Sequence, residues 1–72
     1  MGTDVNKTKA FELYEKSANL GNCQAMNNVG TYYGRGLGEV TKDLNKAREW
    51  CTKAASQGYT AAQTHLDELN AQ

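Results

Sequence analysis

The feature that most constrains this chain is an internal repeat, because the sequence matches itself once at an offset of 37 residues. The identical pairs are Lys9 and Lys46, Ala10 and Ala47, Glu12 and Glu49, Lys16 and Lys53, Ala18 and Ala55, Gly21 and Gly58, and Ala25 and Ala62. Periods of about 20–50 residues are typical of repeat proteins, in which each unit buries its apolar face against its neighbours. Such chains usually present a surface to other molecules, so an enzyme is not expected.

The composition favours closely packed helices. Leu, Ile, Val and Phe supply only 10 of the 72 residues, while nine alanines, four tyrosines and one tryptophan supply other apolar surface. Small side chains let helices approach closely, and the large rings fill the gaps between them. Ile is absent and Val is scarce, which argues against a β-sheet. The predicted fold class is therefore all-α.

Glycines and capping residues predict where the helices begin and end. Gly21 and Gly58 are expected to stop the first and third helices, and Asn22 and Asp43 to cap the second and third. Candidate caps of the first helix are Thr3, Asp4 and Asn6. We expect helices at about residues 5–20, 23–33, 44–57 and 60–70.

Short turns at Gly21 and Gly58 predict antiparallel helical hairpins. Residues 1–72 are then one domain, a short right-handed α-solenoid of two hairpins. Apolar spacing predicts the inward face of the first helix, and Trp50 is expected in the core. That inward face consists of Ala10, Leu13, Tyr14, Ser17 and Ala18.

The pattern of small, aromatic and glycine positions resembles the Sel-one-like repeat, an α-solenoid family related to tetratricopeptide repeats. The resemblance covers about residues 6–66 and includes segments 9–18, 21–22 and 46–55, with Ala25, Val29, Gly30, Tyr33, Gly36, Gly38, Asp43 and Gly58. It implies a module that binds proteins or peptides without a cofactor. Small free-standing arrays of this family suggest a bacterial source.

The chain departs from the family pattern at several positions. The glycine-rich loop is one residue longer, with Glu39 where Val is usual, and Cys51 replaces the ring of Tyr14. Asp67 and Asn70 stand where the first copy has Gly30 and Tyr33, which suggests a terminal cap and a genuine C-terminus. The first helix lacks a preceding partner helix, so either the array was longer or a second copy covers that helix.

The sequence gives little support for a catalytic pair, a disulfide, a phosphate-binding loop or a metal site. Cys51 and His65 are expected to be a core residue and a surface or groove residue rather than a catalytic pair. Cys23 and Cys51 are about 9 Å out of register in an antiparallel pair, so two free thiols are expected. The segment 34–38 follows a helix rather than a strand, which argues against a phosphate-binding loop. One His and two separated Cys do not predict a metal site.

The resemblance places the concave face on the second and fourth helices. The predicted partner-binding residues are Gln24, Asn27, Thr31, Arg35, Thr64 and Glu68. Asn27 and its neighbours Gln24 and Asn28 offer amide donors and acceptors suited to a peptide backbone. Arg35 on the loop rim and His65 are expected to add charge contacts. Amides on a helix surface are as often merely solvated, so this assignment competes with a plain solvent-facing surface.

Charge and hydropathy narrow the choice of partner. The formal net charge is zero, which gives no electrostatic reason to expect nucleic acid or an acidic membrane. The sequence lacks both a signal peptide and a run of about 18 apolar residues, so a cytoplasmic protein is expected.

The second functional hypothesis is a structural unit that self-associates through the first helix, because two repeats fall short of the roughly three usually needed for stability.

Overall fold

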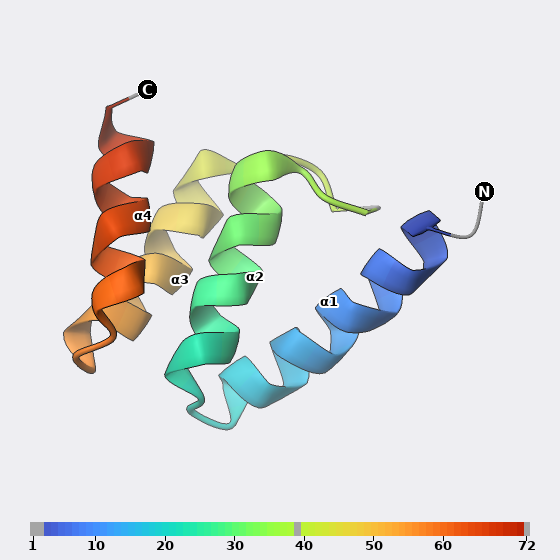
Figure 1. The fold of residues 1–72 in the computed structure, drawn as a ribbon, viewed down its shortest axis with the longest axis horizontal. Coiled ribbons are helices and arrows are strands. Elements are labelled where there is room, and N and C mark those ends of the chain that lie inside the picture. The colour runs from blue at the N-terminus through green and yellow to red at the C-terminus, as the bar shows by residue number, and fades with distance from the viewer. Residues whose placement is uncertain (1–2, 39, 72) are drawn as a thin grey trace.

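Helices connected by short segments make up the described chain. A computed structural model describes residues 3–38 and 40–71, with the side chains of residues 8–38 and 40–71. In these residues four helices and no strands occur, so the chain is all-α. The bounds differ from the expected ones by at most two residues. The helices are α1 (Thr3–Asn19), α2 (Cys23–Arg35), α3 (Leu44–Ser56) and α4 (Thr60–Asn70) (Figure 1).

Local turn chemistry sets several of the helix boundaries. Gly21 and Gly58 follow α1 and α3 with φ angles of 99° and 94°, a conformation that glycine adopts without steric cost. The Asn22 side chain accepts a hydrogen bond from the backbone N–H three residues further on at 2.9 Å. Asp43 does the same at the start of α3, at 3.1 Å. The two predicted stops and the two predicted caps are therefore confirmed.

The start of α1 corrects one prediction. The helix already begins at Thr3, so Thr3, Asp4 and Asn6 lie inside it and none precedes its first turn. An acidic residue such as Asp4 is compatible with the first turn because the helix dipole is positive there. The same residue types therefore predict either a cap or a first turn, and the sequence does not separate the two.

The glycine-rich connection between α2 and α3 begins with a tight C-terminal turn. Gly36 has φ 65°, and the N–H groups of Gly36 and Leu37 both donate to the Tyr32 carbonyl, at 2.7 and 3.1 Å. The N–H of Asp43 donates to the Tyr33 carbonyl at 2.9 Å, which brings the start of α3 back to the end of α2. Glu39, which stands where the family pattern has Val, lies outside the described residues.

The core is small and consists mainly of alanines. α2 packs against α1 and α3 and also touches α4, while α4 packs against α3. Val29 of α2 and Cys51 of α3 are the largest completely buried side chains among the described residues. The buried apolar side chains are Ala18, Ala25, Met26, Val29, Ala47, Cys51, Ala54, Ala62 and Leu69. Trp50 is partly buried against this core.

Aromatic rings join α1 to α2. The ring of Phe11 lies 5.4 Å from the ring of Tyr32 and 5.6 Å from that of Tyr33, and the Tyr14 ring lies 5.9 Å from that of Tyr32. These spacings are in the range where aromatic pairs attract each other beyond simple burial. α1 therefore packs on α2 through its rings.

The exposure of Leu13 contradicts the predicted inward face of α1. Leu13 is 66% exposed, and Leu20 at the end of the helix is 86% exposed. The apolar stripe of α1 is wide, but among the described residues only α2 covers it. Leu13 lies on the part of the stripe that α2 does not reach.

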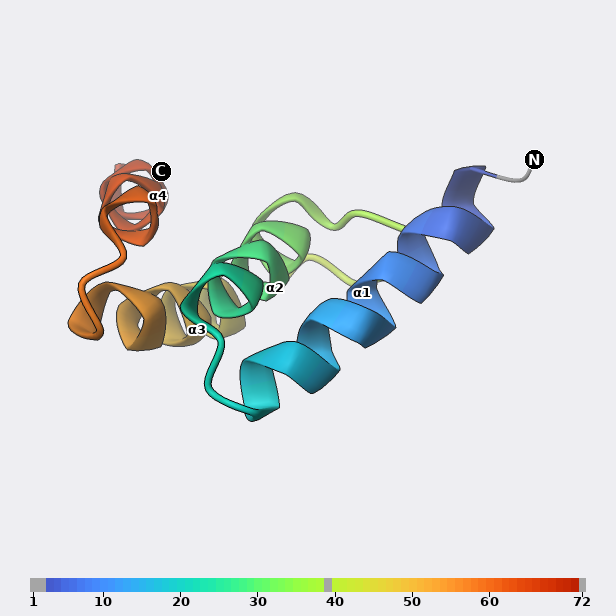
Figure 2. The same cartoon turned by 60° about the horizontal axis from the view of Figure 1, so that its bottom comes forward.

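The helices alternate between two layers. Figure 2 shows α2 and α4 on one side of the array and α1 and α3 on the other. α2 and α4 are neighbours within their layer and make direct contact. The surface between these two helices is where the sequence predicts the concave face.

Candidate partner-binding groove

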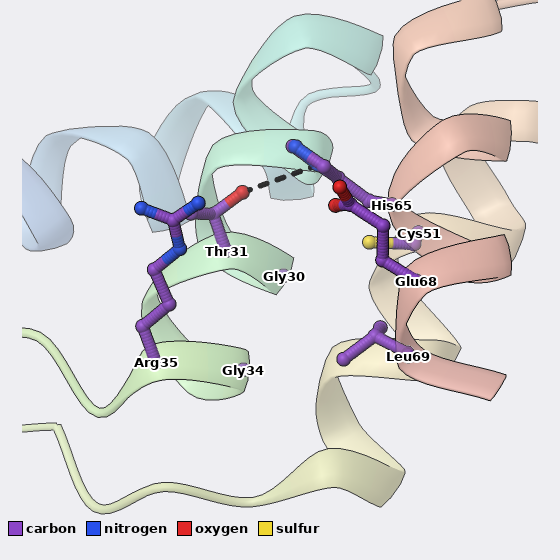
Figure 3. A pocket seen from close by; sticks show the side chains of 8 residues that line it. All are labelled: Gly30, Thr31, Gly34, Arg35, Cys51, His65, Glu68 and Leu69. Carbon is purple, nitrogen blue, oxygen red and sulfur yellow. Dashed lines mark hydrogen bonds between the residues drawn. The ribbon is translucent and has the colours of Figure 1, made fainter. Parts of the chain in front are cut away.

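A cavity of about 270 Å³ lies between α2 and α4 and has Cys51 of α3 at its base. We call it the α2–α4 groove. Figure 3 shows its side chains converging from the two helices across the gap between them. Its lining residues are Gly30, Thr31, Gly34, Arg35, Cys51, His65, Glu68 and Leu69.

Two of the α2 residues that line the groove are glycines, and neighbouring helices pack closely against both. A Cβ atom at Gly30 would lie only 2.7 Å from Sγ of Cys51 and 3.2 Å from the Ala47 carbonyl oxygen. A Cβ atom at Gly34 would lie 3.4 Å from Leu69, an ordinary contact at the edge of the tight range. Gly30 therefore allows α2 and α3 to approach closely, and Leu69 of α4 packs beside Gly34.

A hydrogen-bonded network joins the two helices beside the cavity. Nδ1 of His65 lies 2.7 Å from Oδ1 of Asn27 and 3.3 Å from Oγ1 of Thr31. The Thr31 hydroxyl donates to the Asn27 carbonyl at 3.0 Å, so its oxygen is left to accept. Both neighbours of Nδ1 are thus acceptors, which assigns the imidazole proton to Nδ1. The network fixes the position of α4 relative to α2.

Two charged side chains form the rim of the groove. Arg35, the last residue of α2, and Glu68 of α4 are both exposed and lie on opposite walls (Figure 3). Among the described residues neither one has an ion-pair or hydrogen-bonding partner through its side chain. The groove therefore combines an apolar base with one free cation and one free anion at the rim.

The predicted partner-binding residues lie in three different places. Thr31, Arg35 and Glu68 line the α2–α4 groove. Gln24 borders a separate, shallow hollow near the start of α2, and Thr64 is exposed on α4 outside the lining of the groove. Asn27 was expected on the surface but is only 5% exposed, because α4 covers it and His65 bonds its side chain. Asn27 is therefore not a groove-lining residue, and its side chain holds His65, which does line the groove.

Sequence reasoning missed the base of the groove. Cys51 and Leu69 were expected simply as buried residues, Gly30 as part of a helix stripe, and Gly34 as the first residue of a loop. The signal for Gly30 was present, since a glycine in the middle of a helix is costly unless close packing requires it. The contribution of Leu69 depends on how α4 crosses α2, which the sequence pattern does not specify.

Cys51 and His65 line the same cavity, yet their environment does not resemble that of a catalytic pair. Burial raises the pKa of the Cys51 thiol, whereas a nucleophilic cysteine needs a lowered pKa. Nδ1 of His65 is held by Asn27. Both Cys23 and Cys51 are free thiols, as predicted. Within the described part of the chain, no three His, Cys, Asp or Glu residues are grouped so that they could hold a metal ion.

Comparisons with known proteins identify the family. The Sel1 repeat matches residues 1–22 and 23–59, and the second match contains α2 and α3 together. The chain is also 34% identical over 61 residues to the ERAD-associated E3 ubiquitin-protein ligase component HRD3A of Arabidopsis thaliana, covering 85% of this chain. It spans only 9% of the length of that relative. No solved structure matches the chain.

Hydropathy adds one further observation about the helices. None of the helices found in residues 3–38 and 40–71 combines the length and the apolar character that crossing a membrane requires.

The resemblance to Sel-one-like repeats is confirmed by the family match, and α1 to α4 are the helices of a tetratricopeptide-like helical repeat. The chain belongs to the Sel1 repeat family.

Proposed function

We propose that this chain is a non-catalytic protein–protein interaction module that binds a peptide or partner protein in the α2–α4 groove. The observation that carries the proposal is the cavity itself, which has an apolar base and two unpaired charges at its rim. Concave sites at which a few polar groups converge are typical binding sites. The relative HRD3A is a component of a ligase, which supports an interaction role.

The proposed contacts follow from where the residues lie. Thr31, Arg35 and Glu68 contact the partner directly, because they line the cavity. Gln24 and Thr64 extend the contact along α2 and α4. Asn27 contributes by holding His65 in place. A cytoplasmic location remains a prediction, and the two free thiols favour a reducing compartment.

Removing the two rim charges tests the groove. We expect the double variant Arg35→Ala/Glu68→Ala to lose capture of the partner from a lysate of the source organism, with affinity about tenfold lower. The matched control is Lys42→Ala/Glu49→Ala, which removes one exposed charge of each sign outside the groove. Circular dichroism checks that both variants remain helical. Equal capture by both variants would contradict the proposed groove.

A second candidate function is a structural unit that self-associates through α1. The specific observation is the exposure of Leu13 on α1 and of Leu20 directly after it, at 66% and 86%, while α2 packs against α1. Large apolar side chains exposed together often mark an interaction surface. In this alternative a second copy of the chain covers the exposed side of α1.

The alternative predicts a melting temperature that depends on protein concentration. If copies associate through α1, the melting temperature rises with concentration, because association stabilises only the folded state. Leu13→Glu removes this dependence, while Glu12→Gln, a change at the neighbouring exposed position, leaves it in place. The check is a thermal melt at several concentrations together with analytical ultracentrifugation. A monomer with a constant melting temperature favours the groove as the functional site.

A further inference from the structure

α1 and α3 occupy equivalent places in the repeat, but one side of α1 is much less covered. The offset of 37 residues pairs α1 with α3 and α2 with α4, and the glycine turns after α1 and α3 have similar φ angles of 99° and 94°. The completely buried residues of α3 are Ala47, Cys51 and Ala54. Their equivalents in α1, which are only partly buried, are Ala10, Tyr14 and Ser17. α3 therefore has a covering element that α1 lacks within the described residues.

The covering element that α1 lacks is the equivalent of α2. α3 packs on both α2 and α4, whereas among the described helices α1 packs on α2 alone (Figure 1). Because the α1–α2 hairpin is equivalent to the α3–α4 hairpin, the missing contact is the one that α3 makes with α2. Leu13 is 66% exposed and borders a hollow of about 420 Å³, while its equivalent Trp50 is packed against the core. We call this side the open face of α1, and it consists of Lys9, Ala10, Leu13, Lys16 and Leu20.

The contact between α2 and α3 shows which residues fit such a face. Gly30 lies so close to α3 that a Cβ atom there would be 2.7 Å from Sγ of Cys51 and 3.2 Å from the Ala47 carbonyl oxygen. One turn further along α2, the ring centre of Tyr33 lies 5.3 Å from Nζ of Lys46. Such a distance allows an attraction between the ammonium and the ring. The residues equivalent to Lys46 and Ala47 on α1 are identical, namely Lys9 and Ala10.

The start of α2 contacts the residue that follows α3. Oε1 of Gln57 accepts a hydrogen bond from the Cys23 thiol at 2.8 Å, and Nε2 of Gln57 donates to Sδ of Met26 at 3.8 Å. α2 thus runs antiparallel to α3. The equivalent of Gln57 is Leu20, which is 86% exposed, so the residue opposite it should be apolar.

We propose that the open face of α1 binds one helix of a partner protein, antiparallel to α1 and patterned like α2. That helix carries an aliphatic residue, a glycine or alanine four positions later, and an aromatic residue three positions after that. The small residue lies against Ala10, the aromatic ring against the ammonium of Lys9, and the aliphatic residue against Leu20. This surface is separate from the α2–α4 groove, so the inference goes beyond the proposed function.

A second copy of the chain does not supply a helix of this kind. At the positions where α2 has Met26, Gly30 and Tyr33, its equivalent α4 has Gln63, Asp67 and Asn70. Asp67 is longer than the glycine that close approach requires, and Gln63 donates a hydrogen bond to its carboxylate at 3.2 Å. Burial of these polar groups against Leu20 and Ala10 would cost free energy. α2 itself already packs between α1 and α3, so the partner has a different sequence.

A helical peptide with the sequence of residues 22–36 of this chain tests the inference on the full chain. A covalent staple between positions 24 and 28 keeps the peptide helical, and it lies on the side opposite Gly30. Added to the full chain, the peptide is expected to shift the amide NMR signals of α1 around Ala10, Leu13 and Leu20. Leu13→Glu in the chain should weaken this binding at least about tenfold. The matched control Thr52→Glu places the same charge at an exposed position in α3 and should leave the binding unchanged.

A second peptide tests the close approach. The same peptide with Gly30→Leu should bind at least about tenfold more weakly, because the larger side chain holds the two helices apart. Equal binding of the two peptides, no binding of either, or shifts confined to α3 and α4 would overturn the inference. Shifts of the α1 signals with the concentration of the chain alone would assign the open face to a second copy and overturn it as well. None of these outcomes depends on the α2–α4 groove.

Discussion

Replacing Gly30 by alanine is expected to destabilise the folded chain. A Cβ atom there would lie 2.7 Å from Sγ of the buried Cys51, closer than real Cβ atoms approach, and 3.2 Å from the backbone oxygen of Ala47, a tight contact. Overpacking of this kind costs about 1–3 kcal/mol, partly offset by the roughly 0.5–1 kcal/mol that alanine gains over glycine in a helix. We expect the free energy of unfolding to fall by on the order of 1–2 kcal/mol in urea denaturation.

Gly34 provides the matched control for this prediction, one helical turn further along α2. A Cβ atom at Gly34 meets Leu69 at 3.4 Å and Ala47 at 3.6 Å, which is ordinary contact. Gly34→Ala should therefore be neutral or stabilising by up to about 1 kcal/mol. Adding Cys51→Ala to Gly30→Ala removes the clashing sulfur and should give a smaller loss than the sum of the two single changes. Equal losses for the two glycine changes would contradict a close approach at Gly30.

The second large effect concerns the contact between Asn27 and His65. Removing the imidazole by His65→Ala leaves the amide of Asn27, which is 5% exposed, without its partner. An unsatisfied buried polar group costs about 1–3 kcal/mol, so the free energy of unfolding should fall by that amount. Asn27→Ala should also destabilise the chain, because it removes the same contact between α2 and α4.

A double-mutant cycle separates this contact from other effects of the two changes. The double variant Asn27→Ala/His65→Ala should lose less than the sum of the single losses, by roughly 0.5–3 kcal/mol. Gln63→Ala is the control, since Gln63 of α4 makes only an exposed hydrogen bond to Asp67, and its change should stay within about 0.5 kcal/mol. Urea denaturation of each variant gives the values. Additive losses for Asn27 and His65 would show that the 2.7 Å contact adds no stability.

The features that the sequence predicted correctly are those that depend on near neighbours. Gly21 and Gly58 stop their helices through backbone conformation, and Asn22 and Asp43 cap theirs through bonds to residues three positions away. Each of these effects acts within one turn of the chain, so the residue type and its position are enough to predict where a helix starts or stops. The repeat of 37 residues then placed equivalent turns in both copies.

The wrong expectations concern contacts between helices. Leu13 was expected to be buried because it continues an apolar stripe, but a stripe does not specify how much of it a neighbouring helix covers. Asn27 was expected at the surface because it lies off the apolar stripe of its helix, yet His65, 38 positions away in the sequence, hydrogen-bonds to it. Both outcomes depend on the crossing of one helix over another. Spacing along a single helix does not determine that crossing.

Because Cys51 is buried, the rate at which a thiol reagent modifies it should report local opening of the fold. Thiol reagents attack the thiolate, and burial both shields the sulfur and raises the pKa of Cys51 above its ordinary value of 9.0. The half-buried Cys23 hydrogen-bonds only to the exposed Gln57, so it should be modified first. The slower modification of Cys51, followed by mass spectrometry, then reports how often the helices around it open.

The same burial predicts a loss of stability in alkaline solution. Since the folded state raises the pKa of Cys51, its contribution is complete below the ordinary thiol pKa and is lost as the pH rises toward the raised value. Modification of Cys51 should therefore accelerate with pH more steeply than that of Cys23, because higher pH both ionises the thiol and favours opening. The modification rate of Cys51, compared with that of Cys23 on the same molecule, therefore measures local opening at the base of the groove.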